Sequence, residues 1–177
     1  LADPFEVTCS EKGKGRWADG RNWIYDFEKN LSAGVKCEFL LRDDVKSLSG
    51  KPLTGQRRFS FSTGGPAIRD SFPRDGSERI DENQIFILTV DAEADAESVI
   101  TNVSCAVEGI NERVGVRILT GKEREKILKA QWYGREQEMP LLVVQCRQGF
   151  PNDSGVRLVW GKGVRSLSGV ATTEDQV

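Results

Sequence analysis

The sequence predicts an all-β protein made of two tandem β-sandwich domains. The first observation behind this prediction is an internal repeat, in which residues 45–50 (VKSLSG) recur 119 positions later as residues 164–169 (VRSLSG). The second is a series of short stretches in which apolar and polar residues alternate, as they do in half-buried strands. Turn-forming residues separate these stretches about every ten residues, a spacing typical of β-sandwiches.

The repeat also indicates where one domain ends and the next begins. Upstream of the shared motif, residues 30–36 (NLSAGVK) are echoed by residues 148–157 (QGFPNDSGVR), and both copies run from a Gly-Val-basic triplet into an apolar stretch. Solenoid repeats are much shorter, so this spacing indicates a duplicated module. Gly64-Gly65-Pro66 cannot continue a strand ladder. We therefore predict a first domain at residues 1–65 and a second at residues 66–177, joined by a short linker and in contact.

The first domain is predicted to contain strands and turns but no helix. Its strands are expected where aromatic and β-branched residues alternate with polar ones. Residues 11–15 are expected to form a polar turn, because glycine and charged residues make up the whole of that stretch. The strands predicted on this basis cover residues 5–9, 23–27, 35–41 and 58–63.

The second domain is predicted to hold five strands. Residues 84–90 are the most apolar stretch, and we expect them to form a central strand with both faces buried. Nothing like Phe59-Ser60-Phe61 follows the second copy of the motif, so either the sequence ends before that strand or the strand is supplied otherwise. The other predicted strands cover residues 100–108, 113–119, 141–146 and 156–160, the last being the counterpart of the strand that opens at Val35.

The second domain also carries a predicted helical insertion near residues 122–133. Glu125 and Lys129, like Leu128 and Trp132, are four residues apart, the spacing at which helical side chains meet. The helix either covers an open end of the sandwich or serves as a partner-binding appendage. The acidic residues 91–97 are interpreted as a solvated loop or a short turn of helix, because they lack the glycine and the spacing of an EF-hand calcium loop.

The composition argues against several functional classes. The 177 residues include 25 Lys and Arg against 27 Asp and Glu, a net charge of −2, and the basic residues are dispersed. This pattern does not fit a nucleic-acid-binding surface or a polybasic membrane patch. No apolar run approaches the length of a membrane span. Histidine is absent, which removes the commonest general base and metal ligand, so we expect no enzymatic activity, no cofactor and no metal.

The four cysteines fall two to each predicted domain. Cys9 and Cys37 lie in the first, Cys105 and Cys146 in the second, and none belongs to a Cys-x-x-Cys pair. Four cysteines allow three connectivities, and their segregation favours Cys9–Cys37 and Cys105–Cys146, each worth on the order of 3 kcal/mol. The alternative is buried free thiols. Disulfides would place the chain in an oxidising compartment outside the cytosol.

Other candidate sites have a structural and a functional interpretation. The alternating positions of the framework aromatic residues favour core packing over a glycan-binding platform. Gly161-Lys162-Gly163 lacks the Ser or Thr that follows the lysine of a phosphate-binding loop. The paired acids at 43–44 and 81–82 have no third group for acid–base chemistry and suit turns or caps. We therefore expect no catalytic, cofactor-binding or metal-binding residues. The framework aromatic residues are Trp17, Trp23, Phe39, Phe61 and Trp160.

Several of these stretches resemble one known family, the bacterial alpha-2-macroglobulin-like proteins, over nearly the whole chain. The residues that carry the resemblance to the N-terminal part of that family are Cys9, residues 17–25 (WADGRNWIY), 33–37 (AGVKC), 59–66 (FSFSTGGP), 80–84 (IDENQ) and 158–163 (LVWGKG). The resemblance implies two immunoglobulin-like domains within a large periplasmic or cell-envelope protease inhibitor that traps proteases. It implies neighbouring domains as direct partners and proteases as partners of the full-length protein, with no nucleic acid and no direct membrane insertion.

The chain also departs from the pattern of that family. None of its cysteines stands in the Cys-Gly/Leu-Glu-Gln setting of a thioester, which leaves it the role of a non-catalytic structural or interaction module. The first module of the family normally begins with another strand before Asp3-Pro4-Phe5. Leu1-Ala2-Asp3-Pro4 is not a signal peptide, and a piece cut from a longer protein would begin in this way. The alternatives are an immunoglobulin-like spacer of an adhesin or surface-layer protein, and an accessory carbohydrate-binding domain.

Overall fold

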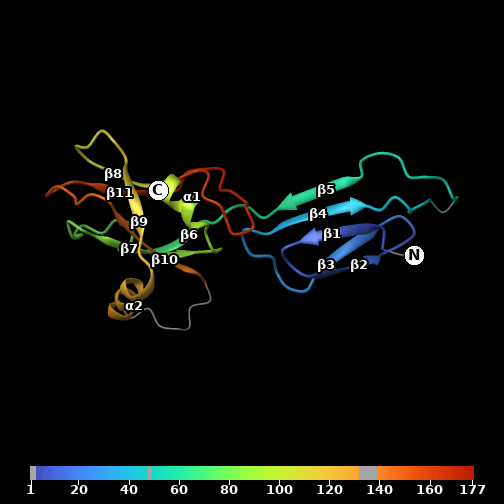
Figure 1. Ribbon diagram of the computed structural model, residues 1–177, viewed down its shortest axis with the longest axis horizontal. Coiled ribbons are helices and arrows are strands. Elements are labelled where there is room, and N and C mark those ends of the chain that lie inside the picture. The colour runs from blue at the N-terminus through green and yellow to red at the C-terminus, as the bar shows by residue number, and fades with distance from the viewer. Residues whose placement is uncertain (1–2, 48, 132–138) are drawn as a thin grey trace.

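The computed structural model describes residues 3–47, 49–131 and 139–177 and shows two lobes joined at a narrow waist (Figure 1). The first lobe contains strands β1 to β5, and the second contains β6 to β11 with helices α1 and α2. The predicted all-β class is confirmed, because strands build both lobes and the two helices are short. Neither helix is long and apolar enough to cross a membrane within the described residues. The predicted boundary at residues 65 and 66 stays a prediction.

The first lobe is a small sandwich of two antiparallel sheets. One has the strand order β1-β4-β5, and the other is the hairpin β2-β3. Aromatic rings fill the space between them, with Phe5 and Trp23 at a centroid distance of 4.9 Å and Tyr25 and Phe39 at 5.3 Å. These contacts connect the hairpin to β1 and β4. The bounds are β1 (Phe5–Cys9), β2 (Gly13–Trp17), β3 (Trp23–Phe27), β4 (Lys36–Leu41) and β5 (Arg58–Ser62).

The predicted turn at residues 11–15 is wrong, because Gly13 to Gly15 belong to strand β2. A Cβ atom on Gly13 would lie closer than 3.0 Å to the ring of Tyr25, and one on Gly15 equally close to the ring of Trp23. The rings of β3 therefore lie across the backbone of β2, and glycine is the residue that leaves room for them. The glycines that suggested a turn therefore belong to a strand, where they leave room for the aromatic side chains of the neighbouring strand β3.

Gly15→Ala should lower the free energy of unfolding by about 1–3 kcal/mol, the usual cost of forcing extra volume into a packed site. Gly115→Ala is the matched control, because Gly115 also lies in a strand and its added Cβ would have no neighbour nearer than 3.9 Å. That control should be neutral or stabilising by roughly 0.5–1 kcal/mol. Urea denaturation followed by circular dichroism measures both. Equal effects of the two substitutions would contradict the packing of Trp23 over β2.

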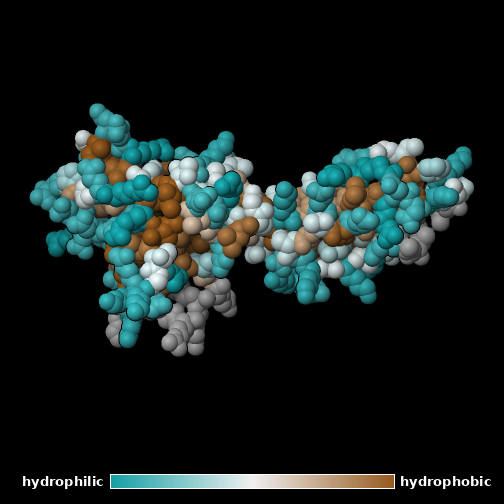
Figure 2. All heavy atoms as spheres, in the orientation of Figure 1, coloured by the Kyte–Doolittle hydropathy of each residue, from teal (hydrophilic) through white to brown (hydrophobic). Residues whose placement is uncertain are grey.

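The second lobe is a six-stranded antiparallel sheet that curls around the main hydrophobic core, in the order β11-β8-β9-β10-β7-β6. Figure 2 shows hydrophobic residues gathered toward the middle of this lobe, whereas hydrophilic residues cover most of the visible face of the first. The fold is thus sandwich-like, close to a barrel. The bounds are β6 (Ile68–Phe72), β7 (Ile85–Val90), β8 (Val103–Val107), β9 (Val114–Ile118), β10 (Leu141–Cys146) and β11 (Val156–Trp160).

Strand β7 is buried on both faces, as its apolar sequence predicts. Its inner face contributes Leu88 to the main core, and Ile87 on its outer face forms a smaller cluster with Leu119 and Val143. Helix α2 (Gly121–Ala130) covers this outer cluster through Ile127 and Leu128. The predicted helical insertion is therefore present, but it covers a face of the sheet and not an open end. Residues 132–138 of the predicted stretch lie outside the described residues.

The strand predicted at residues 100–108 begins later than expected, because helix α1 (Ala96–Asn102) occupies its first three positions. Asp95 caps this helix, and its carboxylate accepts a hydrogen bond from the Ser98 backbone N–H at 3.0 Å. Val99 is fully buried in the main core. The stretch from Ile100 to Val103 is thus divided between a capped helix and strand β8.

Candidate functional site

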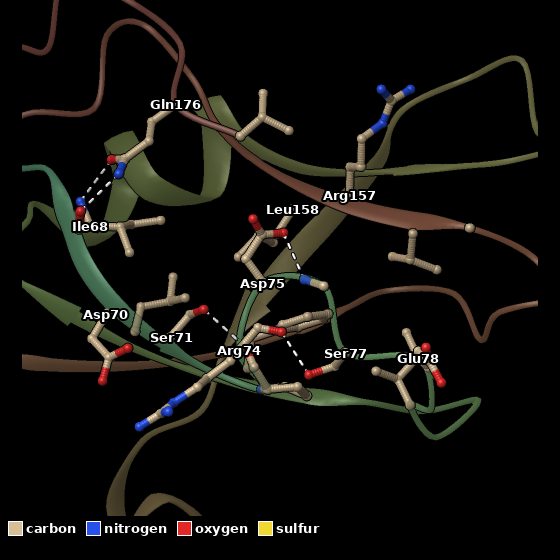
Figure 3. Close-up of a pocket in the computed structure, with 18 of the residues that line it drawn as sticks. Ile68, Asp70, Ser71, Arg74, Asp75, Ser77, Glu78, Arg157, Leu158 and Gln176 are labelled. Carbon is tan, nitrogen blue, oxygen red and sulfur yellow. Dashed lines mark hydrogen bonds between the residues drawn. The ribbon is translucent and has the colours of Figure 1, made fainter.

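A hollow in the second lobe lies between strands β6 and β11, the two edges of its sheet. We call this groove the seam; it has a volume of about 820 Å³ and is lined by β6, β11, the turn at residues 73–78 and the final residues 176 and 177 (Figure 3). Its volume lies in the range of ligand-binding sites. Because edge strands carry unpaired main-chain groups, a sheet that stops short of closure is open to further pairing here.

Gln176 closes one end of the seam by bridging both of its walls. Its backbone exchanges two hydrogen bonds with Trp160 on β11, at 2.8 and 2.9 Å. Its side-chain Nε2 donates to the Ile68 carbonyl on β6 at 2.8 Å, and the Ile68 N–H donates to Oε1 at 2.9 Å (Figure 3). A single residue therefore spans the gap at this end, with its backbone on β11 and its side chain on β6.

Strand β11 also presents main-chain groups to the seam at residues that precede Trp160. In an antiparallel strand, alternate residues direct their N–H and C=O groups to opposite neighbours. Trp160 bonds outward to Gln176, whereas Gly155 accepts a hydrogen bond from Glu108 on the side of β8. The main-chain N–H and C=O groups of Leu158 and Val156, like those of Trp160, therefore point away from β8 and toward the seam.

The floor of the seam is apolar and its rim is charged. Phe86 and Leu88 at the floor belong to the buried core, with exposed fractions of 8% and 0%. Ile68, Ile80, Val156 and Leu158 pack against the same core while lining the groove. Around the rim lie Asp70, Arg74, Asp75, Glu78 and Arg157 (Figure 3). The arrangement suits a ligand that has an apolar side and a polar side.

A compact turn forms one wall of the rim. The Ser77 side chain donates to the Arg74 carbonyl at 2.7 Å, and the Gly76 N–H donates to the Asp75 carboxylate at 2.9 Å. Ser71 at the end of β6 donates through Oγ to the Pro73 carbonyl at 2.9 Å, which ties the turn to the strand (Figure 3). The wall is therefore held in place by its own hydrogen bonds.

The four cysteines form the two disulfides that their segregation favours. Cys9 and Cys37 are directly opposed on neighbouring strands β1 and β4. Cys105 and Cys146 connect β8 to β10, two strands separated by β9 in the sheet, and both lie in the main core. Disulfides of this kind are typical of proteins outside the reducing cytosol.

The framework aromatic residues lie away from the seam. Trp160 is fully buried and donates its indole N–H to the Pro66 carbonyl at 2.9 Å. Trp23, Phe39 and Phe61 belong to the ring cluster of the first lobe, and Trp17 is half-buried on β2. They do not form one shared platform, so the glycan-binding interpretation finds no common surface among them.

Several of the acidic residues weighed as catalytic or calcium-binding groups have structural partners. Asp43 pairs with Arg57, and Asp91 pairs with Arg69. The hydrogen bond from the Ser98 backbone N–H, assisted by Arg165, lowers the pKa of Asp95 below its ordinary value. Within the described ranges, no three or more His, Cys, Asp or Glu side chains come together in a way that could hold a metal ion.

The glycines of residues 161–163 are required by packing. A Cβ atom on Gly161 would lie closer than 3.0 Å to the Asn102 carbonyl oxygen, at the end of α1. The Lys162 backbone N–H donates to the Asp175 carboxylate at 2.7 Å, so an acidic side chain occupies the place where a phosphate loop would hold its anion.

Sequence reasoning did not locate the seam, because its walls β6 and β11 lie far apart in the chain and come together only in the folded sheet. No protein-family model, curated protein or solved structure matches the chain.

Proposed function

We propose that this chain is a non-catalytic structural and interaction module of a bacterial alpha-2-macroglobulin-like protease inhibitor of the periplasm or cell envelope. In this proposal the two lobes are tandem immunoglobulin-like domains. The observation that carries the proposal is the joint between them, which is built from the duplicated motif itself.

The joint rests on direct contacts between the second copy of the motif and the first lobe. The Ser166 and Ser168 hydroxyls both donate to the Gly34 carbonyl. Gly34 has a positive φ of 79°, and a Cβ atom on it would lie closer than 3.0 Å to Ser166. A Cβ atom on Gly65 would collide in the same way with the backbone of Ala171. Such close backbone approach restricts movement between the lobes.

The described residues of the first copy of the motif make hydrogen bonds that match those of the second, but they lie at the end of the first lobe farthest from the waist (Figure 1). The Ser47 N–H donates to the Lys51 carbonyl at 2.9 Å, matching the Ser166 N–H to Val170 carbonyl bond at 2.8 Å. Gly50 has a φ of 77°, where its counterpart in the second copy has 83°. A second, preformed copy of the docking loop at this end supports a protein in which such modules follow one another in series.

Two further features support the family and the location. Residues 59–66, which carry part of the resemblance to the alpha-2-macroglobulin-like proteins, include Gly65, which lies against Ala171 and Thr172 beside the second motif. The Gly34 N–H donates to the Gly64 carbonyl at 2.8 Å, so the resemblance falls on residues that form the joint. The two disulfides suit the oxidising periplasm.

Replacing Ser166 and Ser168 together by alanine should loosen the joint. The Gly34 carbonyl would lose both hydroxyl donors, and a buried acceptor left without a partner costs about 1–3 kcal/mol. Double electron–electron resonance between spin-labelled p-acetylphenylalanine residues at exposed Lys14 and Glu112 measures the distance between the lobes. We expect a narrow distribution in the parent protein and a clearly broader one in the variant.

The duplicated motif offers a matched control for this experiment. Ser47→Ala with Ser49→Ala removes the same two hydroxyls from the copy at the free end, and should leave the distribution between the lobes unchanged. If both double variants broaden the distribution equally, or if the parent distribution is already broad, the joint does not hold the lobes in a fixed orientation.

The protease-trap assignment is tested on the full-length protein that contains this chain. Incubated with an endopeptidase, it should suppress cleavage of a large protein substrate, while the captured enzyme still hydrolyses a small chromogenic peptide. The 177-residue chain alone should neither cleave peptides nor incorporate methylamine. Unimpeded cleavage of the large substrate would contradict the inhibitor, and methylamine incorporation by the chain alone would contradict a non-catalytic module.

A further inference from the structure

We propose that Asn30 is the acceptor site for an N-linked glycan, attached outside the cytosol by a bacterial oligosaccharyltransferase. The inference goes beyond the structural role proposed above and shares with it only that location and the bacterial origin. It rests on a five-residue sequence around Asn30 and on the way in which the fold presents this sequence.

Three asparagines of the chain stand in Asn-x-Ser sequences whose middle residue is not proline. They lie in residues 30–32 (NLS), 102–104 (NVS) and 152–154 (NDS). In a surface loop of an exported protein, such a sequence is an acceptor for N-glycosylation. Bacterial oligosaccharyltransferases also recognise an acidic residue two positions before the asparagine. Glu28 supplies this residue for Asn30, whereas the apolar residues Ile100 and Phe150 precede the other two.

The fold presents residues 28–32 in the loop between β3 and β4, at the end of the first lobe that faces the waist (Figure 1). Glu28, Asn30 and Ser32 are exposed in this loop, whereas Leu31 is half-buried. A glycan is bulky and hydrophilic, so its attachment requires an exposed position. The three side chains that a transferase recognises are therefore accessible in the folded protein.

These three recognition groups have no competing partners within the part of the chain that the structure describes. The Asn30 amide, the Ser32 hydroxyl and the Glu28 carboxylate take part in no hydrogen bond or ion pair there. Lys29, which lies between the acid and the asparagine, forms an ion pair with Glu11 at 3.1 Å instead. A transferase can therefore bind all three groups without displacing an internal partner.

The main chain of the loop is anchored on both sides of Asn30. The Glu28 N–H donates to the Lys12 carbonyl at 3.1 Å, and the Thr63 hydroxyl donates to the Ser32 carbonyl at 2.8 Å. Between these anchors, no main-chain hydrogen bond to another described residue fixes residues 29–31. This segment can thus adopt the conformation that a transferase active site requires while the sheets on either side of it stay intact.

The other two Asn-x-Ser sequences are engaged in local structure. The Asn102 side chain is half-buried at the end of α1, and its Nδ2 donates to the Ser98 carbonyl at 2.8 Å. Asn152 is exposed, but the Ser154 hydroxyl that a transferase would recognise donates to the Pro151 carbonyl at 2.7 Å. The complete acceptor sequence and free recognition groups therefore coincide at Asn30.

The proposed reaction transfers an oligosaccharide from a polyprenyl diphosphate carrier to the side chain of Asn30. A bond forms between Nδ2 and C1 of the first sugar while the bond between C1 and the diphosphate oxygen breaks. The polyprenyl diphosphate leaves with the bonding electron pair, and a base of the transferase takes one of the two amide protons. Nothing is oxidised or reduced, and Asn30 keeps its amide carbonyl.

The test uses the whole folded chain, a purified bacterial oligosaccharyltransferase and an oligosaccharide linked to undecaprenyl diphosphate. We expect the intact protein to increase in mass by a single glycan. Peptide mass spectrometry should place this glycan on Asn30 and show Asn102 and Asn152 unmodified.

Substitutions within the loop test the role of each recognition group. Asn30→Gln and Ser32→Ala should abolish modification, whereas Ser32→Thr keeps the hydroxyl and should preserve it. Glu28→Gln should lower the initial rate about tenfold or more, because a hydrogen bond to a charged group is lost. All three positions are exposed, so the circular dichroism spectra of the variants should match that of the parent protein.

A matched control separates the effect of the fold from that of the sequence. Ile100→Glu, at a helical position that is 41% exposed, completes the same acceptor pattern around Asn102. Asn102 should stay unmodified in the folded variant, because its amide donates to the Ser98 carbonyl. A synthetic peptide of residues 98–104 with the same substitution should be glycosylated, since no fold restrains it.

The proposal is overturned if Asn30 stays unmodified, if Ser32→Ala or Glu28→Gln leaves the modification unchanged, or if Asn152 is modified as fast as Asn30. It is also overturned if Asn102 of the folded Ile100→Glu variant is modified as fast as Asn30, since the fold would then not select the site. None of these outcomes changes the distance measurement between the lobes, so failure here can be distinguished from failure of the proposed structural role.

Discussion

Trp160→Ala is expected to lower the free energy of unfolding by about 3–5 kcal/mol, the range for truncating a large buried aromatic side chain. Trp160 is fully buried in the main core, and its indole N–H donates a hydrogen bond to the Pro66 carbonyl. The substitution therefore creates a cavity and leaves a carbonyl without its donor. Urea denaturation monitored by circular dichroism measures the change.

Two control variants divide this effect into its parts. Trp160→Phe keeps most of the ring volume but removes the donor to Pro66, and should cost about 1–3 kcal/mol. Phe59→Ala truncates a ring that is 42% exposed on an edge strand, and should cost less than Trp160→Ala. A stable Trp160→Ala protein that loses binding to a glycan would contradict the core assignment and favour the carbohydrate-binding alternative.

Replacing Cys105 and Cys146 together by alanine should cost about 2–5 kcal/mol, the range for removing a native disulfide from a small domain. This bond closes a sequence separation of 41 residues and joins two strands that are not neighbours in the sheet. No main-chain pairing between β8 and β10 replaces it, because β9 lies between them. Thermal unfolding and hydrogen exchange of the core amides of β7 and β8 provide the measurement.

The other disulfide supplies the matched control. Cys9→Ala with Cys37→Ala removes a bond between residues already held opposite each other by the pairing of β1 and β4. Its effect on hydrogen exchange should be confined to the first lobe, because the contacts of these strands lie there. Faster exchange in β7 after this control, or unchanged exchange in β7 after the first variant, would contradict the assignment of each bond to its own lobe.

Most strands could be located from local sequence, because alternation with a period of two places one side chain in two on a packed face. Residues 5–9 and 23–27 coincide with β1 and β3. Strand β2 was missed because its glycines carry no such signal, and the reason for them is the ring of Trp23 across the sheet. The start of β8 was misplaced because the stretch from Ile100 to Val103 suits a helix and a strand equally well until the Asp95 cap is seen.

By itself, the sequence determined the all-β class, the duplicated motif and the segregation of cysteines that matches the two disulfides. These features depend on residues near one another or on direct comparison of two segments. Tertiary structure alone decided that the second motif docks on Gly34, that α2 covers the outer face of the sheet and that β6 and β11 leave a seam. The physical reason is that each depends on contacts between residues far apart in the chain, whose meeting is set by how the sheet curls and where it stops short of closure.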